Sequence, residues 1–322
     1  MRRRAPIAAA MALSAGLLLL APAAAVPPRV VVSILPLHSL AAAVMTRVAE
    51  PVLLLRGEVS PHVYALRPSE ARRLQEADVV FWVGPALEAF LVRPLQASEA
   101  RNVELMAAPG LELLPLRTSG VWLGPQRGGL PPGPQHPGDQ LPSEPGPAEA
   151  AADPHIWLSP ANAIAIAHYM AAVLAELDPE RADRYRANAE ALREQLARLQ
   201  LEIEGILLPV RERPYAVFHD GYQYFEASFG LQPVGSLVLH PEFGPGAKRL
   251  QALREEIVGR GVVCVFSEPQ FDATLVQRLL EGTGARTGML DPLGSTQTPG
   301  AGAYPQLLRG LAGGLAGCLG VD

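Results

Sequence analysis

The stretch PERADRYRANAEALREQLARLQLEIEGILLPV, residues 179–210, decides how this chain folds. Its apolar side chains recur at alternating steps of three and four residues, which places them along one face of a helix. That face comprises Tyr185, Ala189, Leu192, Leu196, Leu199, Ile203 and Ile206. We therefore expect one long, rigid helix over residues 178–210 that links two domains. A coiled-coil dimer would use a similar stripe, but the heptad pattern here is short and lacks sustained flanking charge pairs.

Short runs rich in β-branched residues alternate with helical patterns on both sides of this helix. Before it, the predicted strands are 29–33, 52–55 and 78–83, and the predicted helices are 37–48, 68–76 and 86–95. After it, the predicted strands are 215–218, 234–239, 261–266 and 286–290. Such alternation is typical of parallel sheets covered by helices on both faces. The prediction is an α/β fold with two lobes, residues 26–177 and residues 211–322, each built on a mainly parallel sheet.

Residues 1–25 have the pattern of a signal peptide. Arg2, Arg3 and Arg4 precede an apolar stretch, and the alanines at 23–25 form a small-residue cleavage pattern. Without these 25 of its 322 residues, the chain retains 297, which suits two domains of about 100–200 residues each. No cysteine lies near the cleavage point to carry a lipid, so we expect a soluble protein of the periplasm.

Charge and motifs exclude some functions. Removal of the signal peptide takes the formal net charge from −5 to −8, because three arginines and no acid are lost. An acidic protein of this kind is a poor ligand for nucleic acid. The chain also lacks the nucleotide-binding P-loop pattern, so any energy source for its activity must be another subunit.

Residues 117–151 interrupt the alternation of strands and helices. In this segment 15 of 35 residues are proline or glycine, a composition that resists both helix and sheet. We predict a mobile loop on the surface of the first lobe.

The chain has two cysteines, Cys264 and Cys318. An even pair in an exported protein predicts a disulfide, because an oxidising compartment leaves few free thiols. Such a bond would tie the C-terminal helix to a buried strand. Two unpaired cysteines that act as small hydrophobic side chains are the alternative.

Three histidines that are far apart in the sequence, His62, His155 and His219, each lie where an apolar run ends and a helix-start signal follows. Ligands of open α/β sheets bind outside the carboxyl ends of the strands. His62 follows the predicted strand 52–55, and His219 stands at the end of the predicted strand 215–218. Because imidazole is the commonest side-chain ligand of zinc and its neighbours, we predict a metal site between the two lobes.

Three acidic residues belong to the same predicted region. Asp291 follows the predicted strand 286–290 and could be a fourth ligand. Asp220 could orient the imidazole of His219, or it could cap the helix that follows. Glu268 ends a strand and could approach the metal site, or it could merely hold a turn.

The remaining histidines illustrate the alternative to metal binding, a hydrogen-bonded or solvated imidazole. His38 and His168 fall within helical patterns, where we expect structural roles. His136 lies in the predicted loop, and His240 precedes a proline at a turn.

Six motifs resemble those of the substrate-binding proteins of zinc-uptake ABC transporters, the ZnuA-like group. In order they are SPHVYALRPS (60–69), ADVVFWVGP (77–85), HIWLSP (155–160), FHDGY (218–222), SEPQF (267–271) and LDPLG (290–294). The resemblance runs over nearly the whole mature chain, and the order of several motifs makes it specific.

The resemblance implies two α/β lobes joined by a long rigid helix, with a metal ion held at their interface by His62, His155 and His219. It also implies that Cys264 and Cys318 form a disulfide found in zinc-specific members. Related manganese and iron binders carry a carboxylate where this chain has His219. A third imidazole favours the borderline-soft Zn(II) over manganese, which prefers oxygen ligands.

The implied function is capture and delivery without chemical conversion, so the protein is not expected to be an enzyme. It would bind Zn(II) in the periplasm and carry it, as a monomer, to a membrane ABC permease driven by a cytoplasmic ATPase. Metal binding should weaken in acid, because only the neutral imidazole is a ligand. A rigid linker helix predicts small movements around the metal in place of wide hinge closure.

Two features depart from the family pattern. Some zinc members place a glutamate directly before the first ligand histidine, whereas this chain has Pro61. Water or Asp291 must then complete the coordination. Zinc members often carry a loop rich in histidine and acids, whereas the 117–151 segment contains a single histidine. We therefore expect this segment to be a flexible cover.

Rival functions would use the same residues. A manganese or iron binder of the same transporter type is one rival. A zinc hydrolase is another, since three protein ligands and a water also build catalytic sites, with Glu268 as a general base. The chain lacks His-Glu-x-x-His and similar signatures, which disfavours the hydrolase. A surface adhesin is disfavoured by the absence of a lipid-anchor cysteine.

Overall fold

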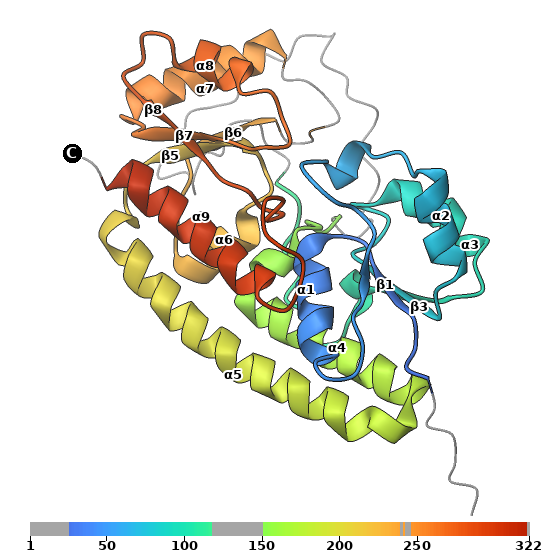
Figure 1. The fold of residues 1–322 in the computed structure, drawn as a ribbon. Coiled ribbons are helices and arrows are strands. Elements are labelled where there is room, and N and C mark those ends of the chain that lie inside the picture. Colours follow the sequence, from blue (N-terminus) through green and yellow to red (C-terminus); the bar gives the residue numbers. More distant parts are fainter. Residues whose placement is uncertain (1–25, 118–150, 239–240, 242–245, 321–322) are drawn as a thin grey trace, which may run out of the picture.

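Two four-stranded parallel sheets form the frame of the molecule (Figure 1). The structure is a computed structural model that describes residues 26–117, 151–238, 241 and 246–320. The predicted signal peptide, most of the 117–151 segment, His136 and His240 lie outside the described residues. The predicted α/β class with parallel sheets is confirmed.

The two sheets share one strand order. The first runs β2-β1-β3-β4 and the second β6-β5-β7-β8. The strands of the first sheet are β1 (Val30–Val32), β2 (Val52–Leu53), β3 (Val79–Trp82) and β4 (Arg101–Glu104). Those of the second are β5 (Tyr215–His219), β6 (Gly235–Val238), β7 (Cys264–Ser267) and β8 (Arg286–Met289). In each sheet the central pair is buried, as in the register Tyr215 with Cys264.

The helices divide into an inner and an outer group. The inner helices are α1 (Leu35–Val44), α4 (Pro160–Leu177), α5 (Ala182–Leu207), α6 (Gln223–Phe229) and α9 (Ala303–Leu319). The outer helices are α2 (Pro68–Gln75) and α3 (Val92–Gln96) on the first sheet, and α7 (Ala247–Gly259) and α8 (Thr274–Leu280) on the second. Figure 1 shows α5 running below both halves.

Helix α5 confirms the predicted linker. Short 3₁₀ turns over Pro179–Arg181 and Leu208–Val210 flank its 26 residues, so helical backbone covers nearly the whole predicted range. It packs on α4, α9, α1 and α6, and thus on both halves. At its end Leu207 is buried and Ile206 only half-buried, which corrects the predicted stripe by one residue. The largest cluster of buried apolar side chains among the described residues includes this helix and has members from β1 to α9, while a separate cluster lies between the second sheet and helices α7 and α8.

The predicted lobe limits at 177 and 211 stay predictions. Helix α9 belongs to the second half by sequence but packs on α1 of the first half. The backbone N–H of Tyr304 in α9 donates to Ser39 Oγ of α1 at 2.8 Å. The two halves are therefore joined by more than the linker helix.

Several element limits differ from the prediction. Strand β4 was not predicted, because it lies at a sheet edge and only Val103 among its four residues is buried. The helix predicted over 86–95 begins later, as a 3₁₀ turn at Ala89–Leu91 followed by α3. The carboxylate of Glu88 accepts the backbone N–H groups of Val83 and Gly84 and so holds a turn there.

Two further boundaries follow from backbone conformation. The helix predicted over 37–48 begins at Leu35, because Pro36 suits the first turn of a helix, and it ends at Val44. Arg47 has a left-handed φ of 63°, which prevents continuation. The strand predicted from Gly261 begins only at Cys264, because Gly261, with a φ of 60°, still belongs to the turn after α7.

The predicted disulfide is present. Cys264 of β7 and Cys318 of α9 are bonded, with a Cα–Cα distance of 6.2 Å, so the bond ties the C-terminal helix to a central strand of the second sheet. Tyr304 and Cys318 thus fasten opposite parts of α9 to different halves of the molecule.

Replacing both Cys264 and Cys318 with serine is expected to lower the free energy of unfolding by about 2–4 kcal/mol, because the bond closes a loop of sequence separation 54 and restricts the unfolded chain. Urea unfolding of the oxidised protein and the double variant will measure this difference. An unchanged unfolding midpoint would show that the bond does not contribute to stability.

Candidate metal centre

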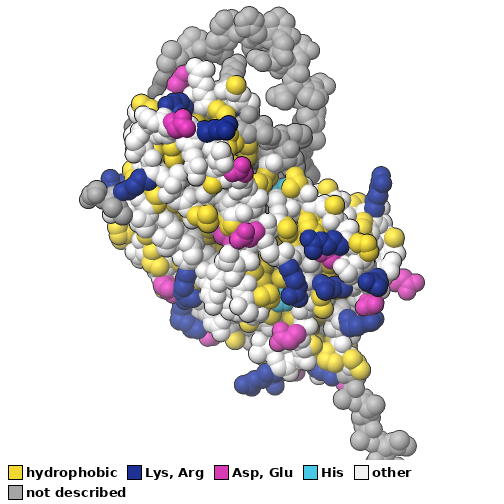
Figure 2. Space-filling model, turned by 45° about the horizontal axis from the view of Figure 1, so that its top comes forward, with side chains coloured by type: hydrophobic (Ala, Val, Ile, Leu, Met, Phe, Trp, Pro, Cys, Tyr) yellow, Lys and Arg dark blue, Asp and Glu magenta, His cyan; other side chains and the backbone are white. Residues whose placement is uncertain are grey.

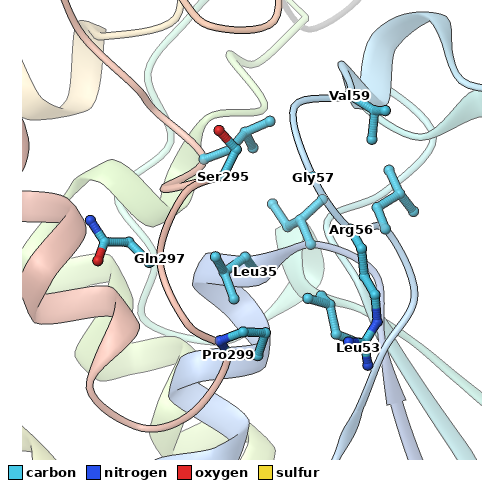
Figure 3. A pocket seen from close by; sticks show the side chains of 11 residues that line it. Leu35, Leu53, Arg56, Gly57, Val59, Ser295, Gln297 and Pro299 are labelled. Atoms are coloured by element: carbon cyan, nitrogen blue, oxygen red, sulfur yellow. The ribbon is translucent and has the colours of Figure 1, made fainter.

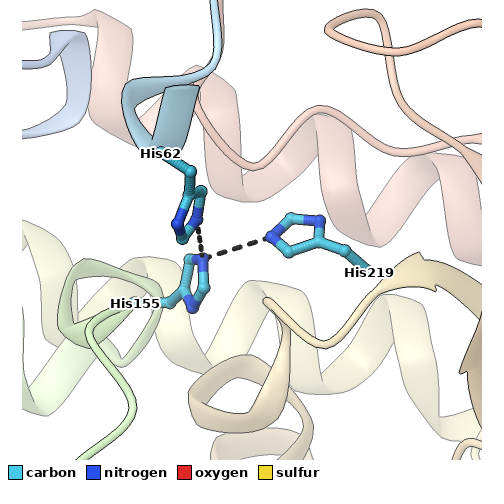
Figure 4. A group of neighbouring side chains, drawn as sticks. All are labelled: His62, His155 and His219. Carbon is cyan, nitrogen blue, oxygen red and sulfur yellow. Dashed lines mark hydrogen bonds between the residues drawn. The ribbon is translucent and has the colours of Figure 1, made fainter. Parts of the chain in front are cut away.

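Three imidazoles from three different elements converge at one point (Figure 4). His62 lies in the 3₁₀ turn Pro61–Val63, and His155 directly precedes the 3₁₀ turn Ile156–Leu158. His219 is the last residue of β5, at the carboxyl end of the second sheet. The predicted grouping of the three histidines is thus found. Among the described residues, these three side chains form the one group of His, Cys, Asp and Glu whose ligand atoms are close enough together to share a metal ion.

The distances between the nitrogens fit a shared ion. Nε2 of His155 lies 3.3 Å from Nε2 of His62 and 3.2 Å from Nε2 of His219. Two nitrogens at about 2.0–2.1 Å from one tetrahedral zinc lie about 3.3–3.4 Å apart. Two of the three nitrogen pairs therefore already have about the spacing of ligands on a tetrahedral zinc, and the ligand atoms of all three histidines lie within 4.8 Å of one another.

Two of the imidazoles are held from behind by buried carboxylates. Asp153 Oδ1 lies 2.7 Å from Nδ1 of His155, and Glu268 Oε1 lies 2.5 Å from Nδ1 of His219. A carboxylate accepts from an N–H group, which places the proton on Nδ1 and leaves the lone pair of Nε2 directed at the centre. Both carboxylates thereby select the tautomer that can bind a metal.

Local backbone structure explains these placements. The carboxylate of Asp153 also accepts the backbone N–H of His155 at 2.9 Å, a tight turn that aims the ring. Glu268 directly follows β7, which pairs in parallel with β5, the strand that ends at His219. Because parallel neighbours end at the same sheet edge, Glu268 lies beside His219 as a consequence of topology.

The centre is small and mostly buried. His155 and His219 are 4% and 3% exposed, while His62 is half-buried and lies on the solvent side. Little histidine surface shows on the face seen in Figure 2. The cavity between the rings has a volume of about 10 Å³, bordered by Trp157 and Phe271. That volume holds about one water-sized particle, so the site suits an ion and not an organic ligand.

A larger cavity of about 180 Å³ lies between the first sheet and the loop after β8 (Figure 3). Leu53, Val59 and Pro299 are among its lining residues, with Arg56 as the charged one. It shares Leu293 with the histidine cavity. None of the described residues that line it is a His, Cys, Asp or Glu.

Electrostatics at His219 reflect two opposed effects. Burial lowers the pKa of this imidazole, but the carboxylate of Glu268 beside it raises the pKa, with a net increase above the usual 6.5. The same carboxylate makes the neutral imidazole a stronger electron donor toward a metal.

The structure places Asp291 in its own loop. Its Oδ1 accepts hydrogen bonds from the side chain of Gln270 and from the backbone of Leu293 and Gly294, and its Oδ2 accepts two from Ser295. Asp291 does not join the cluster of mutually close ligand atoms that the three histidines form. The loop it holds places the carbonyl of residue 292 against Nε1 of the Trp157 indole, at 2.8 Å.

The acidic candidates beside His219 have separate roles. Glu268 contacts the imidazole, whereas the carboxylate of Asp220 accepts from Arg117 at 3.0 Å. Burial raises the pKa of Asp220 to about 7. Sequence reasoning assigned no role to Asp153 or Arg117. Asp153 could have been found from its position two residues before His155, since ligand histidines commonly donate to a carboxylate.

Known proteins resemble this chain over most of its length. Residues 30–318 match a family described as zinc-uptake complex component A, periplasmic (ZnuA). The Brucella abortus high-affinity zinc uptake system protein ZnuA is 42% identical over 304 residues, which cover 90% of this chain and 91% of that protein. The Yersinia pestis protein of the same name is 39% identical, covering 95% and 96% of the two chains.

Solved structures show the same architecture. A crystal structure of ZnuA superimposes with a TM-score of 0.73 at 25% identity, covering 91% of this chain and 99% of that one. A zinc-bound ZnuA with residues 138–173 deleted, in its own numbering, gives a TM-score of 0.72, also at 25% identity, with coverage of 92% and 99%. The structure of FpvC in complex with Mn²⁺ superimposes with a TM-score of 0.73 at 22% identity and covers 91% of this chain and 98% of that one. This similarity shows a common fold and nothing more.

Glu268→Gln is expected to weaken zinc binding by about 10–100-fold, because glutamine keeps the size of the side chain but removes the charge that supports His219. A competition titration against a zinc chelator will measure the affinity. Glu190→Gln is the matched control, since Glu190 lies 3.8 Å from His168 on the surface and its loss should leave zinc affinity unchanged. Equal affinities of both variants would contradict the role of Glu268.

As the pH is lowered, the zinc affinity is expected to start to decline above pH 6.5. The reason is that the pKa of His219 is raised above 6.5 and a protonated imidazole cannot bind a metal. Titrations between about pH 5 and 8 will show the midpoint. In Glu268→Gln the decline should begin at a lower pH, since the charge that raises the pKa is gone. A midpoint that does not move between the two proteins would argue against this coupling.

Proposed function

This chain belongs to the ZnuA family of periplasmic zinc-uptake components, and we propose that it captures Zn(II) between its two halves and delivers the ion to an ABC permease for import. The proposed protein ligands are His62, His155 and His219. The observation that carries this proposal is the spacing of 3.2 and 3.3 Å between Nε2 atoms whose rings are oriented by carboxylates.

We propose water as the fourth ligand. Pro61 occupies the position before His62, so no carboxylate precedes the first ligand. Asp291 already accepts five hydrogen bonds within its loop, and withdrawing it would leave those donors without an acceptor. A water bound on the half-buried side of the centre, beside His62, requires no such loss.

Zinc is the proposed cargo because the donor set is all nitrogen. Three neutral imidazoles suit a borderline ion that accepts tetrahedral geometry, whereas manganese and magnesium prefer oxygen ligands and higher coordination numbers. A manganese or iron carrier with this fold would need a carboxylate in the cluster, and the cluster contains only His62, His155 and His219.

Transport is favoured over hydrolysis. In a zinc hydrolase a free carboxylate would act as base toward the metal-bound water. The candidate for that role, Glu268, bonds Nδ1 of His219 on the side of the ring away from the centre. Glu268 is 2% exposed, and its hydrogen bond to His219 accounts for this burial without any catalytic role.

The proposed delivery of zinc to a permease requires that the protein act in the periplasm. We propose that residues 1–25 direct export to the periplasm and that the mature protein works there as a monomer. The zinc-loaded form would dock on the permease, and a cytoplasmic ATPase would supply the energy for transport. Because contacts such as Trp157 Nε1 to the Pro292 carbonyl cross between the halves, we expect loading to move side chains and loops near the metal more than whole lobes.

The metal-stripped protein titrated with zinc and manganese in competition is expected to bind one zinc per chain and to exclude manganese. His219→Ala should weaken zinc binding by more than the about 10–100-fold expected for an outer partner, because it removes a ligand. Bound metal is measured directly after equilibrium dialysis.

His168→Ala is the control for this titration, since His168 is an exposed histidine of α4 whose nearest acidic partner is Glu190. Its zinc affinity should match that of the unchanged protein. A preference for manganese, or a His219→Ala variant that binds zinc as well as His168→Ala does, would overturn the proposed function.

A further inference from the structure

Arg117 reaches two buried carboxylates in the other half of the molecule. Its Nη1 lies 3.0 Å from Asp220 Oδ1 and its Nη2 lies 2.8 Å from Glu226 Oε2. The side chains of Asp220 and Glu226 are 6% and 2% exposed, and that of Arg117 is 24% exposed. One guanidinium therefore joins two carboxyl groups that the fold has removed from water.

One end of this ion cluster adjoins His219. Asp220 is the next residue in the chain, and its backbone N–H donates to the carbonyl of Val238 at 3.2 Å. The turn that carries the ligand out of β5 is thus held on one side by β6 and on the other by Arg117. A displacement of Asp220 would be passed on to His219.

The other end of the cluster leads to His155. Helix α6 carries Glu226 and also Tyr224, whose hydroxyl donates to the backbone carbonyl of Asp153 at 2.9 Å. Asp153 in turn holds the imidazole of His155. A continuous set of contacts therefore runs from one buried ligand to the other, and Arg117 is its link between Asp220 and α6.

The geometry favours an arginine over a lysine at position 117. A guanidinium presents several N–H groups in a fixed plane and can bind two carboxylates at once, whereas the ammonium of a lysine is a compact point charge. Without the guanidinium, the two buried carboxyl groups would lose the donor that they share, and Arg117 would no longer tie the turn after β5 to helix α6.

We propose that Arg117 is a positioning residue of the metal centre, which sets the relative placement of His155 and His219 by joining Asp220 to Glu226. The proposal rests on the proposed function, since it concerns the same site. It assigns zinc retention to a residue that is not among the proposed ligands and that is the first residue of the proline- and glycine-rich segment 117–151.

The test compares Arg117→Met and Arg117→Lys with the unchanged full-length protein, by zinc competition titration and by the absorption spectrum of bound Co(II). Arg117→Met is expected to lose about 10–100-fold in zinc affinity, the range for outer partners of metal ligands. The Co(II) bands should change in position or intensity, because the ligand geometry is altered. Arg117→Lys should recover part of the affinity.

A matched control separates positioning from general stability. Arg181 pairs with the buried Asp178 at 2.9 Å, with side chains 23% and 4% exposed, and lies at the start of α5. Arg181→Met should lower the thermal unfolding temperature but leave zinc affinity and the Co(II) spectrum unchanged. If Arg117→Met behaves like Arg181→Met, the proposal is wrong.

A rescue variant keeps the proposal testable if Arg117→Met folds poorly. The triple change Arg117→Met/Asp220→Asn/Glu226→Gln also replaces the two carboxyl groups that lose their partner, so it should bind zinc at least tenfold more tightly than Arg117→Met alone. A triple variant no better than the single one would overturn the assigned role. Absence of zinc binding by the unchanged protein would instead overturn the proposed function, which makes the two failures distinguishable.

Discussion

The relative position of the two sheets depends on the burial of the apolar stripe of α5. Leu196, Leu199 and Ile203 of that helix are fully or almost fully buried, and the helix packs on inner helices from both halves. Each such side chain contributes about 1.5–3 kcal/mol when it leaves water. The two sheets are thereby held against one continuous core, so the loops at their carboxyl ends keep fixed relative positions.

Fixed loops matter because the proposed metal centre tolerates little error in the positions of its ligands. Its nitrogens come from both halves of the chain, yet they must lie within a few tenths of an ångström of tetrahedral spacing. Buried hydrogen bonds between the two halves further fix the positions of these loops. The hydroxyl of Tyr304 in α9 donates to the carbonyl of Trp157 at 2.7 Å, and the indole of Trp157 donates to the carbonyl of Pro292 at 2.8 Å. A short run of buried bonds thus joins α9, the His155 turn and the loop after β8.

Charge is concentrated where the ion would bind. Asp153, Glu268, Asp220 and Glu226 are all buried, which is unfavourable for isolated carboxylates. Two of them are stabilised by imidazole N–H groups and two by Arg117. Such surroundings favour a bound cation, as the proposed metal site requires.

The sequence by itself determined the features that depend on local signals. The three-and-four spacing predicted α5, strand ends predicted the positions of His62 and His219, and the cysteine pair predicted the disulfide. Edge strand β4 was missed because a single buried residue leaves no alternating pattern. Only the tertiary structure decided that Glu268 and not Asp220 holds His219, and that Arg117 joins Asp220 to Glu226. Those contacts connect residues that are 49, 103 and 109 positions apart. Such pairing depends on which distant segments the fold brings together, and no local pattern records that.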